Sequence, residues 1–125
     1  MSRPLTAEEV ASYASVVNET VAGRVRVRET ELLPPGTAGM ALRNTILLRN
    51  DYDRRGNNIL LAHELAHVRQ WAELGAVRFL GRYVNEYLRA LLRTRSHHSA
   101  YRAISLEVEA YDAAADWKLS GHIRR

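Results

Sequence analysis

The chain has 125 residues, of which 46% are hydrophobic and 26% are charged. This size and composition fit a single globular domain over residues 1–125 and exclude a disordered chain. Cysteine is absent, which excludes disulfides and thiolate metal sites, so a metal ion would need His, Asp or Glu as ligands. The formal net charge of +4 comes from scattered arginines and gives little reason to expect a nucleic-acid partner. The sequence has no recognisable secretory signal or membrane span, so we expect a cytoplasmic protein without membrane contact.

The beginning of the first helix is clear from the sequence. Thr6 and Glu9 have the spacing of a capping box, in which each side chain bonds to the backbone of the other residue. The pattern predicts a helix from about residue 7 to residue 18. Gly23 is expected to end this helical segment, because glycine readily adopts the backbone conformations that follow a helix.

Three short strands are predicted after this segment. From residue 24 valines alternate with arginines, and a period of two is typical of a strand with one apolar face. The segments 38–42 and 45–49 predict a hairpin, whose second strand has Ile46 and Leu48 on one face. Together these segments predict a small antiparallel sheet of about three strands.

A helix near the middle of the chain follows a polar stretch. Residues 50–56 predict a loop, after which Asn57 or Asn58 is expected to cap a helix that ends near Gly75. On one side of this helix every third or fourth residue is apolar, and these residues should face the core (Leu61, Leu65, Val68 and Ala72).

The opposite side of this helix carries His63-Glu64-Leu65-Ala66-His67. Histidines four positions apart lie about 40° apart around a helix and about 6 Å apart along it, so both imidazoles can reach one metal ion. The glutamate between them adjoins that face without sharing it, and this is the motif of zinc metallopeptidases. We therefore predict Zn²⁺ as the cofactor, His63 and His67 as ligands, and Glu64 as the general base. Gln70 is a candidate to orient a ligand or to satisfy a buried backbone group.

Two more helices are predicted downstream, over 76–94 and from 105 to about 121. The first has an apolar stripe that lies away from its arginines (Leu80, Val84, Tyr87 or Leu88, and Leu91). Its aromatic residues are expected to pack in the core (Phe79, Tyr83 and Tyr87). Residues 95–99, between the two helices, predict a loop with adjacent histidines at positions 97 and 98.

A catalytic zinc site needs a third protein ligand and leaves one position open for water. No histidine follows His67 at the spacing of metzincins, so this ligand must come from a separate element. Glu107 and Glu109 on the last helix are the candidates, and alanines on the apolar face of that helix would allow the two helices to approach closely. Glu109 shares its flank with further acidic residues, as on a solvated surface. This favours Glu107 and leaves Glu109 as the alternative.

The sequence resembles the gluzincin metallopeptidases, whose third ligand lies in a Glu-x-x-Ala-Asp pattern. Glu107-Val108-Glu109-Ala110-Tyr111 matches this pattern at its glutamate and alanine and has tyrosine in place of the acid. More closely, residues 37–115 are similar to a large bacterial family of metallopeptidase domains, often of unknown function, some of them found in contractile-injection-system and toxin loci. Segments 61–70 and 107–111 carry this similarity. It implies a mainly helical α+β minigluzincin domain with a small sheet packed on the motif helix.

The resemblance implies a zinc-dependent endopeptidase that hydrolyses a peptide or protein substrate. The substrate would bind in an extended conformation and add to the strand at 45–49. Tyr111 is the predicted catalytic donor to the developing oxyanion, and there are four other candidates (Tyr101, Arg102, His97 and His98). One alternative function is a catalytically silent zinc-binding domain that acts as an interaction module. The second alternative is a basic, helical nucleic-acid-binding module in which the motif is incidental.

Overall fold

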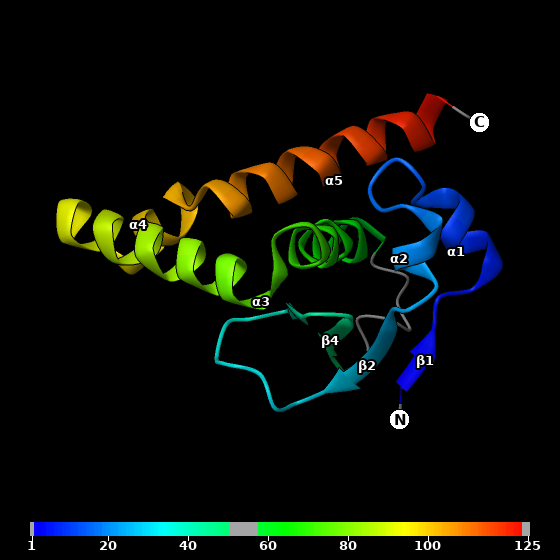
Figure 1. Cartoon of the computed structure of the whole chain (residues 1–125), viewed down its shortest axis with the longest axis horizontal. Helices are drawn as coiled ribbons and strands as arrows, with labels where there is room; N and C mark the ends of the chain where they lie inside the picture. The colour runs from blue at the N-terminus through cyan, green and yellow to red at the C-terminus, as the bar shows by residue number, and fades with distance from the viewer. Residues whose placement is uncertain (1, 51–57, 124–125) are drawn as a thin grey trace.

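The computed structural model describes residues 2–50 and 58–123 (Figure 1). The described part is an α+β domain, which confirms the predicted fold class. Its elements in chain order are β1 (Ser2–Pro4), α1 (Ala7–Ser12), α2 (Glu19–Ala22), β2 (Arg26–Thr30), β3 (Gly39–Leu42), β4 (Thr45–Arg49), α3 (Asn58–Thr94), α4 (His97–Ala103) and α5 (Ser105–Ile123). The first half of α3 lies between the sheet and α5, and these three layers form the main core.

The sheet has four strands in the order β1-β2-β4-β3. β2 and β4 pair in parallel, and each outer strand pairs antiparallel with its neighbour. The prediction of about three antiparallel strands was therefore wrong in number and in direction. The central positions of β2 and β4 agree with the burial of their apolar residues, since Val27, Ile46 and Leu48 are at most 1% exposed.

The hairpin of β3 and β4 has the predicted bounds to within one residue. Arg43, in its two-residue connection, has a φ of 57°, in the left-handed region that such turns require. β4 is paired on both sides, with β2 and with β3, so its backbone groups already have partners. The predicted addition of a substrate to 45–49 was therefore wrong. Within the described residues, β3 has an unpaired edge instead.

The capping box of Thr6 and Glu9 is present, but α1 ends at Ser12 and not near residue 18. Two contacts accompany the early end, one distant in the sequence and one local. The Ser12 carbonyl accepts a hydrogen bond from Trp117 Nε1 at 2.9 Å. The side chain of Asn18 caps the separate helix α2 by accepting from Val21 N, and this helix ends at Gly23 as predicted.

α3 bends at Gly75, whose φ of 80° and ψ of 162° interrupt the helical conformation. The first half therefore ends where it was predicted to end, and a second half follows. In the first half Leu61, Leu65 and Val68 are buried in the core with the sheet. Ala72, predicted to face the core with them, is exposed.

α5 approaches the first half of α3 through small side chains, as predicted. Ala110 and Ala114 are buried, and Ala113 is partly buried in the same core. Further along α5, the ring of Trp117 stacks on Tyr13 with centroids 4.7 Å apart. These contacts hold the first turn of α5 beside the motif helix.

The second half of α3 differs from the prediction. Its buried residues are Phe79 and Ala90, whereas Leu80, Val84 and Leu88 of the predicted apolar stripe are about half exposed. The amphipathic pattern is present, but its aliphatic side does not face the core of the described chain.

The predicted loop at 95–99 is partly helical. The side chain of Ser96 accepts a hydrogen bond from Ser99 N and thereby caps α4, which begins at His97. The predicted loop at 50–56 and the cap at Asn57 lie, apart from Asn50, outside the described residues, as does the side chain of Asn58. No helix in the described ranges is long and apolar enough to cross a membrane.

Candidate metal centre

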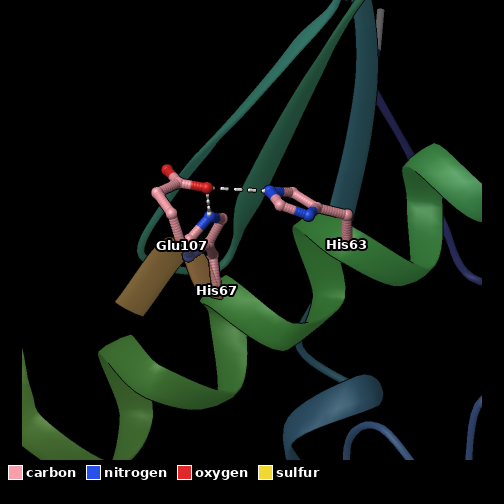
Figure 2. A group of neighbouring side chains, drawn as sticks. All are labelled: His63, His67 and Glu107. Carbon is pink, nitrogen blue, oxygen red and sulfur yellow. Dashed lines mark hydrogen bonds and ion pairs between the residues drawn. The ribbon is translucent and has the colours of Figure 1, made fainter. Parts of the chain in front are cut away.

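Three of the predicted site residues converge where α3 meets α5. His63 and His67 project from α3, and Glu107 projects toward them from the first turn of α5 (Figure 2). Nε2 of each histidine lies 3.0 Å from Oε1 of Glu107, and one ligand atom from each residue lies within 4.8 Å of the others. All three side chains are buried.

This geometry is close to that of a zinc site. Ligand atoms bound at about 2.1 Å to a tetrahedral zinc lie about 3.4 Å from one another. The two separations of 3.0 Å would therefore widen by a few tenths of an ångström on binding, and the third separation, which is at most 4.8 Å, would close by at most about 1.4 Å. Two imidazoles and a carboxylate form a donor set that suits zinc, whereas magnesium and calcium need shells made mostly of oxygen.

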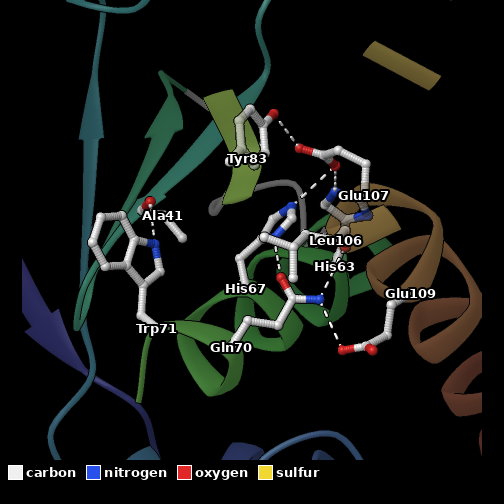
Figure 3. A network of polar contacts seen from close by, with 9 residues as sticks. All are labelled: Ala41, His63, His67, Gln70, Trp71, Tyr83, Leu106, Glu107 and Glu109. Atoms are coloured by element: carbon white, nitrogen blue, oxygen red, sulfur yellow. Dashed lines mark hydrogen bonds and ion pairs between the residues drawn. The ribbon is translucent and has the colours of Figure 1, made fainter. Parts of the chain in front are cut away.

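Glu109, the alternative third ligand, lies outside this group (Figure 3). Its Oε1 accepts hydrogen bonds from Gln70 Nε2 at 2.9 Å and from Arg69 Nη2 at 3.2 Å. The bond from Gln70 and the charge of Arg69 lower the pKa of the Glu109 carboxyl. The structure therefore brings Glu107, and not Glu109, to the histidines.

Gln70 fixes the tautomer of His67. Its Nε2 donates to Leu106 O at 2.9 Å and to Glu109, both of which are pure acceptors, so the amide orientation is determined. The opposite atom, Oε1, then faces Nδ1 of His67 at 2.8 Å and can only accept (Figure 3). Nδ1 must therefore carry a proton, which leaves Nε2 as the metal-binding nitrogen.

Because Gln70 keeps a proton on Nδ1 of His67, a positive charge is needed between Nε2 of His67 and Glu107. A neutral His67 with its proton on Nδ1 presents the lone pair of Nε2 to Oε1 of Glu107, and these lone pairs repel unless a proton or a metal ion lies between them. Burial lowers the pKa of His67, but Glu107 outweighs it and the pKa is raised. Burial also opposes ionisation of Glu107, yet bonds from both histidines hold its pKa far below its usual range. These residues thus fit a divalent cation.

His63 is oriented by packing. Its Nδ1 is buried without a hydrogen-bond partner in the described residues. The ring of Tyr111 lies on it with centroids 4.4 Å apart, and the ring of His67 meets it edge-on at 4.8 Å. The position of Nε2 toward Glu107 therefore depends on these two neighbouring rings.

Glu64 is buried beside the ligands, at 4% exposure. Its Oε2 would lie 3.1 Å from a Cβ atom placed at Gly39, so the absence of a side chain on β3 makes room for this carboxylate. Burial raises the pKa of Glu64, and the nearby histidines offset part of the rise. A carboxylate with a raised pKa, next to a cation site and to an unpaired strand edge, has the properties of a general base.

Three of the five candidate oxyanion donors lie near the metal group. Tyr111 contacts His63, and Tyr101 lies near Tyr111. The guanidinium carbon of Arg102 lies 5.7 Å from the centroid of the Tyr111 ring. Burial raises the pKa of Tyr101, and the negative charge of Glu107 raises it further, so this phenol stays protonated and able to donate.

The other two candidates are not brought into this group. Nδ1 of His97 lies 2.7 Å from the hydroxyl of Tyr87 in an exposed contact. His98 is exposed at the first turn of α4. Neither residue has a described contact with the metal group.

Tyr83, which was predicted only as a core residue, contacts the metal group. Its hydroxyl donates to Oε2 of Glu107 at 2.6 Å, so both oxygens of this carboxylate are held (Figure 3). Burial and the neighbouring carboxylate raise the pKa of Tyr83, which keeps its phenol protonated. A signal was present in the sequence, since Tyr83 shares a helix face with Phe79 and a tyrosine on a buried face needs a partner for its hydroxyl.

Replacing Tyr83 with phenylalanine is expected to weaken zinc binding about tenfold, because Glu107 loses the donor that holds its second oxygen. The dissociation constant is measured by competition with a chromophoric chelator. Tyr87→Phe is the matched control, since it removes a hydroxyl one helical turn away that contacts His97, and its affinity should equal that of the wild type. Equal affinities of the wild type and Tyr83→Phe would show that Glu107 does not depend on this bond.

We compared the chain with models of known protein families, with curated proteins and with solved structures, and found no match. The resemblance to gluzincins therefore stays a prediction. The case for a metal site rests on the geometry of the chain itself.

Proposed function

We propose that the chain is a zinc-dependent peptidase of the gluzincin type. The observation that carries the proposal is the buried group of His63, His67 and Glu107, whose ligand atoms lie within 4.8 Å of one another. Glu64 lies beside this group and outside the ligand set, as a general base must. Two separate helices supply the ligands, and the hydrogen bonds of Gln70 and Tyr83 hold two of them in place.

A zinc ion held by these side chains would polarise a peptide carbonyl and lower the pKa of a water molecule. Glu64 would accept a proton from that water and later deliver it to the nitrogen of the leaving amine. Its raised pKa suits both steps, because the carboxylate must hold the proton between them. Tyr111, whose ring contacts His63, is the proposed donor to the oxygen on which negative charge develops.

The substrate is proposed to bind as an extended strand on β3. Arg49 N donates to Ala38 O, so the alternate residues Gly39 and Ala41 direct their backbone polar groups away from β4. Trp71 Nε1 already binds Ala41 O at 3.1 Å. The backbone groups of Gly39 remain directed outward next to Glu64, which favours binding of the scissile region at this end of β3.

A zinc-loading experiment tests the proposal. Protein stripped by a chelator is expected to bind about one equivalent of zinc and to gain hydrolysis of a quenched fluorescent peptide library with it. His63→Ala should lose both properties. His98→Ala is the matched control, because this histidine is exposed and outside the group, and it should keep both.

The two readouts separate the alternatives. A stripped protein that binds no zinc would refute the metal site and favour a helical binding module. Stoichiometric zinc without hydrolysis of any peptide in the library would refute the peptidase and favour a silent zinc-binding domain.

A further inference from the structure

The second half of α3 carries an aliphatic stripe that no described part of the chain covers. Its members recur every three or four residues and lie within about 120° of the helix surface (Val77, Leu80, Val84, Leu88 and Leu92). Val77 and Leu92 are 86% and 80% exposed, and the other three are about half exposed. The opposite face of the same helix already packs on α4 and α5. An apolar stripe of this length on a surface usually marks an interaction site.

An arginine row runs along one flank of the aliphatic stripe, within about 60° of the helix surface (Arg78, Arg82, Arg89 and Arg93). The other flank, at Tyr87, contacts α4. Arg82 pairs with Glu86 at 3.3 Å, but Arg78, Arg89 and Arg93 make no ion pair within the described residues. The flank therefore keeps uncompensated positive charge.

Glu86 does not neutralise the charge of the other three arginines, because its carboxylate is already bonded to Arg82 and to Ser105 at the start of α5. Its carboxylate accepts hydrogen bonds from Ser105 N at 2.6 Å and from Ser105 Oγ at 2.9 Å. These bonds, with the contact to Arg82, hold the pKa of Glu86 below its usual value although burial opposes them. It is the one acidic residue between positions 76 and 94, against four arginines.

We propose that the aliphatic stripe docks an amphipathic helix of a partner protein, with aliphatic residues on one face and aspartate or glutamate along one flank. The aliphatic residues would pack between those of the stripe, and the acidic flank would lie against the arginine row. We choose an acidic partner helix because its negative charges would complement the positive charges of the arginine row. The positive flank is one-sided, so it also sets the orientation in which the partner helix binds. This site is separate from the metal group and does not depend on the proposed peptidase activity.

Two other occupants fit the surface less well. In an antiparallel pair of two copies of α3, equal flanks face each other, so one arginine row would lie against the other and repel it. A helix that lies in a membrane interface carries basic residues over its polar face, opposite the apolar residues. Here the face opposite the aliphatic stripe packs on α4 and α5, and the arginine row is on one flank only.

The test uses two labelled helical peptides of about 21 residues with leucine and isoleucine along one face. One carries glutamate along a flank, and the other carries lysine there. Fluorescence anisotropy with the whole chain is expected to show at least about tenfold tighter binding of the glutamate peptide at low salt. Val84→Asp with Leu88→Asp should abolish binding. Leu119→Asp changes an exposed leucine on α5 and should bind as the wild type does.

Charge reversal gives a second, independent variant. Arg89→Glu with Arg93→Glu changes exposed residues and should reverse the preference, so that the lysine peptide binds more tightly. Equal binding of both peptides, no binding of either, or binding that survives the two aspartates would each overturn the proposal. It would also be overturned by binding to phosphatidylglycerol vesicles without a peptide preference, or by a dimer in light scattering that the glutamate peptide does not dissociate.

Discussion

Replacing Glu64 with glutamine is expected to lower the rate of peptide hydrolysis by about 10²- to 10⁴-fold while zinc stays bound. Glutamine has nearly the same shape but cannot accept and return a proton. Glu64 is also no ligand, since the close ligand group consists of His63, His67 and Glu107. The measurement compares kcat of the zinc-loaded variant with kcat of the wild type, and metal analysis of the same samples gives the zinc content.

The same substitution should stabilise the zinc-free protein at neutral pH. The pKa of Glu64 is raised in the folded state, so the ionised carboxylate is less stable there than in the unfolded chain. The ionised Glu64 therefore lowers the free energy of unfolding at pH values above the pKa of Glu64 in the folded state. The effect shrinks as the pH falls through that pKa and disappears below the ordinary value of 4.5. Glu64→Gln should therefore melt a few degrees higher than the wild type at pH 8, with the difference closing toward pH 4.5.

These two readouts distinguish lost chemistry from lost structure. A variant that is inactive, zinc-loaded and more heat-stable has lost the base alone. Activity equal to the wild type would remove Glu64 from the mechanism. A lower melting temperature at pH 8 would mean that the carboxylate has a stabilising partner and is not destabilised by burial in its ionised form.

The fold was predictable where local patterns decide it. The capping box at Thr6, the valine alternation of β2 and the break at Gly75 each depend on neighbouring residues, and each is present. The missed features are non-local. β1 has only three residues and contains Pro4, so it shows no period, and it forms because β2 offers an open edge. The parallel pairing of β2 with β4 joins two strands that are not adjacent in the chain, so the pattern of neighbouring residues does not predict it.

The site was predictable to the extent that one helix determines it. The spacing of His63 and His67 fixes their common face, and the alanines of α5 indicated the close approach that brings in Glu107. The supporting contacts join distant parts of the chain. Gln70 reaches Leu106 across 36 positions, and Tyr83 reaches Glu107 only because α3 bends at Gly75. Such hydrogen-bond partners depend on how the helices pack. From the sequence one can predict only that a buried polar group needs some partner.

Replacing Gln70 with leucine is expected to weaken zinc binding about 10- to 100-fold. Leucine has a similar size, but it removes the acceptor that keeps the proton of His67 on Nδ1. It also removes the donor to Leu106 O, beside Glu107, so both ligand-bearing helices lose a shared contact. Leaving these buried groups without partners should also lower the free energy of unfolding by about 1–3 kcal/mol. Chelator competition gives the affinity, and chemical denaturation gives the stability.

Two further variants separate the role of Gln70 toward His67 from its role in packing. Gln70→Glu keeps an acceptor for His67, loses the donors to Leu106 O and Glu109, and sets its carboxylate against that of Glu109. Its stability should therefore stay low, while its zinc affinity should lie nearer that of the wild type than the affinity of Gln70→Leu does. ¹⁵N NMR of the histidine rings should show the proton on Nδ1 in this variant and a mixture of tautomers in Gln70→Leu. Glu109→Gln keeps an acceptor for Gln70 and should bind zinc normally. Loss of zinc in Glu109→Gln, or wild-type affinity in Gln70→Leu, would contradict the arrangement of ligands and supports derived from the structure.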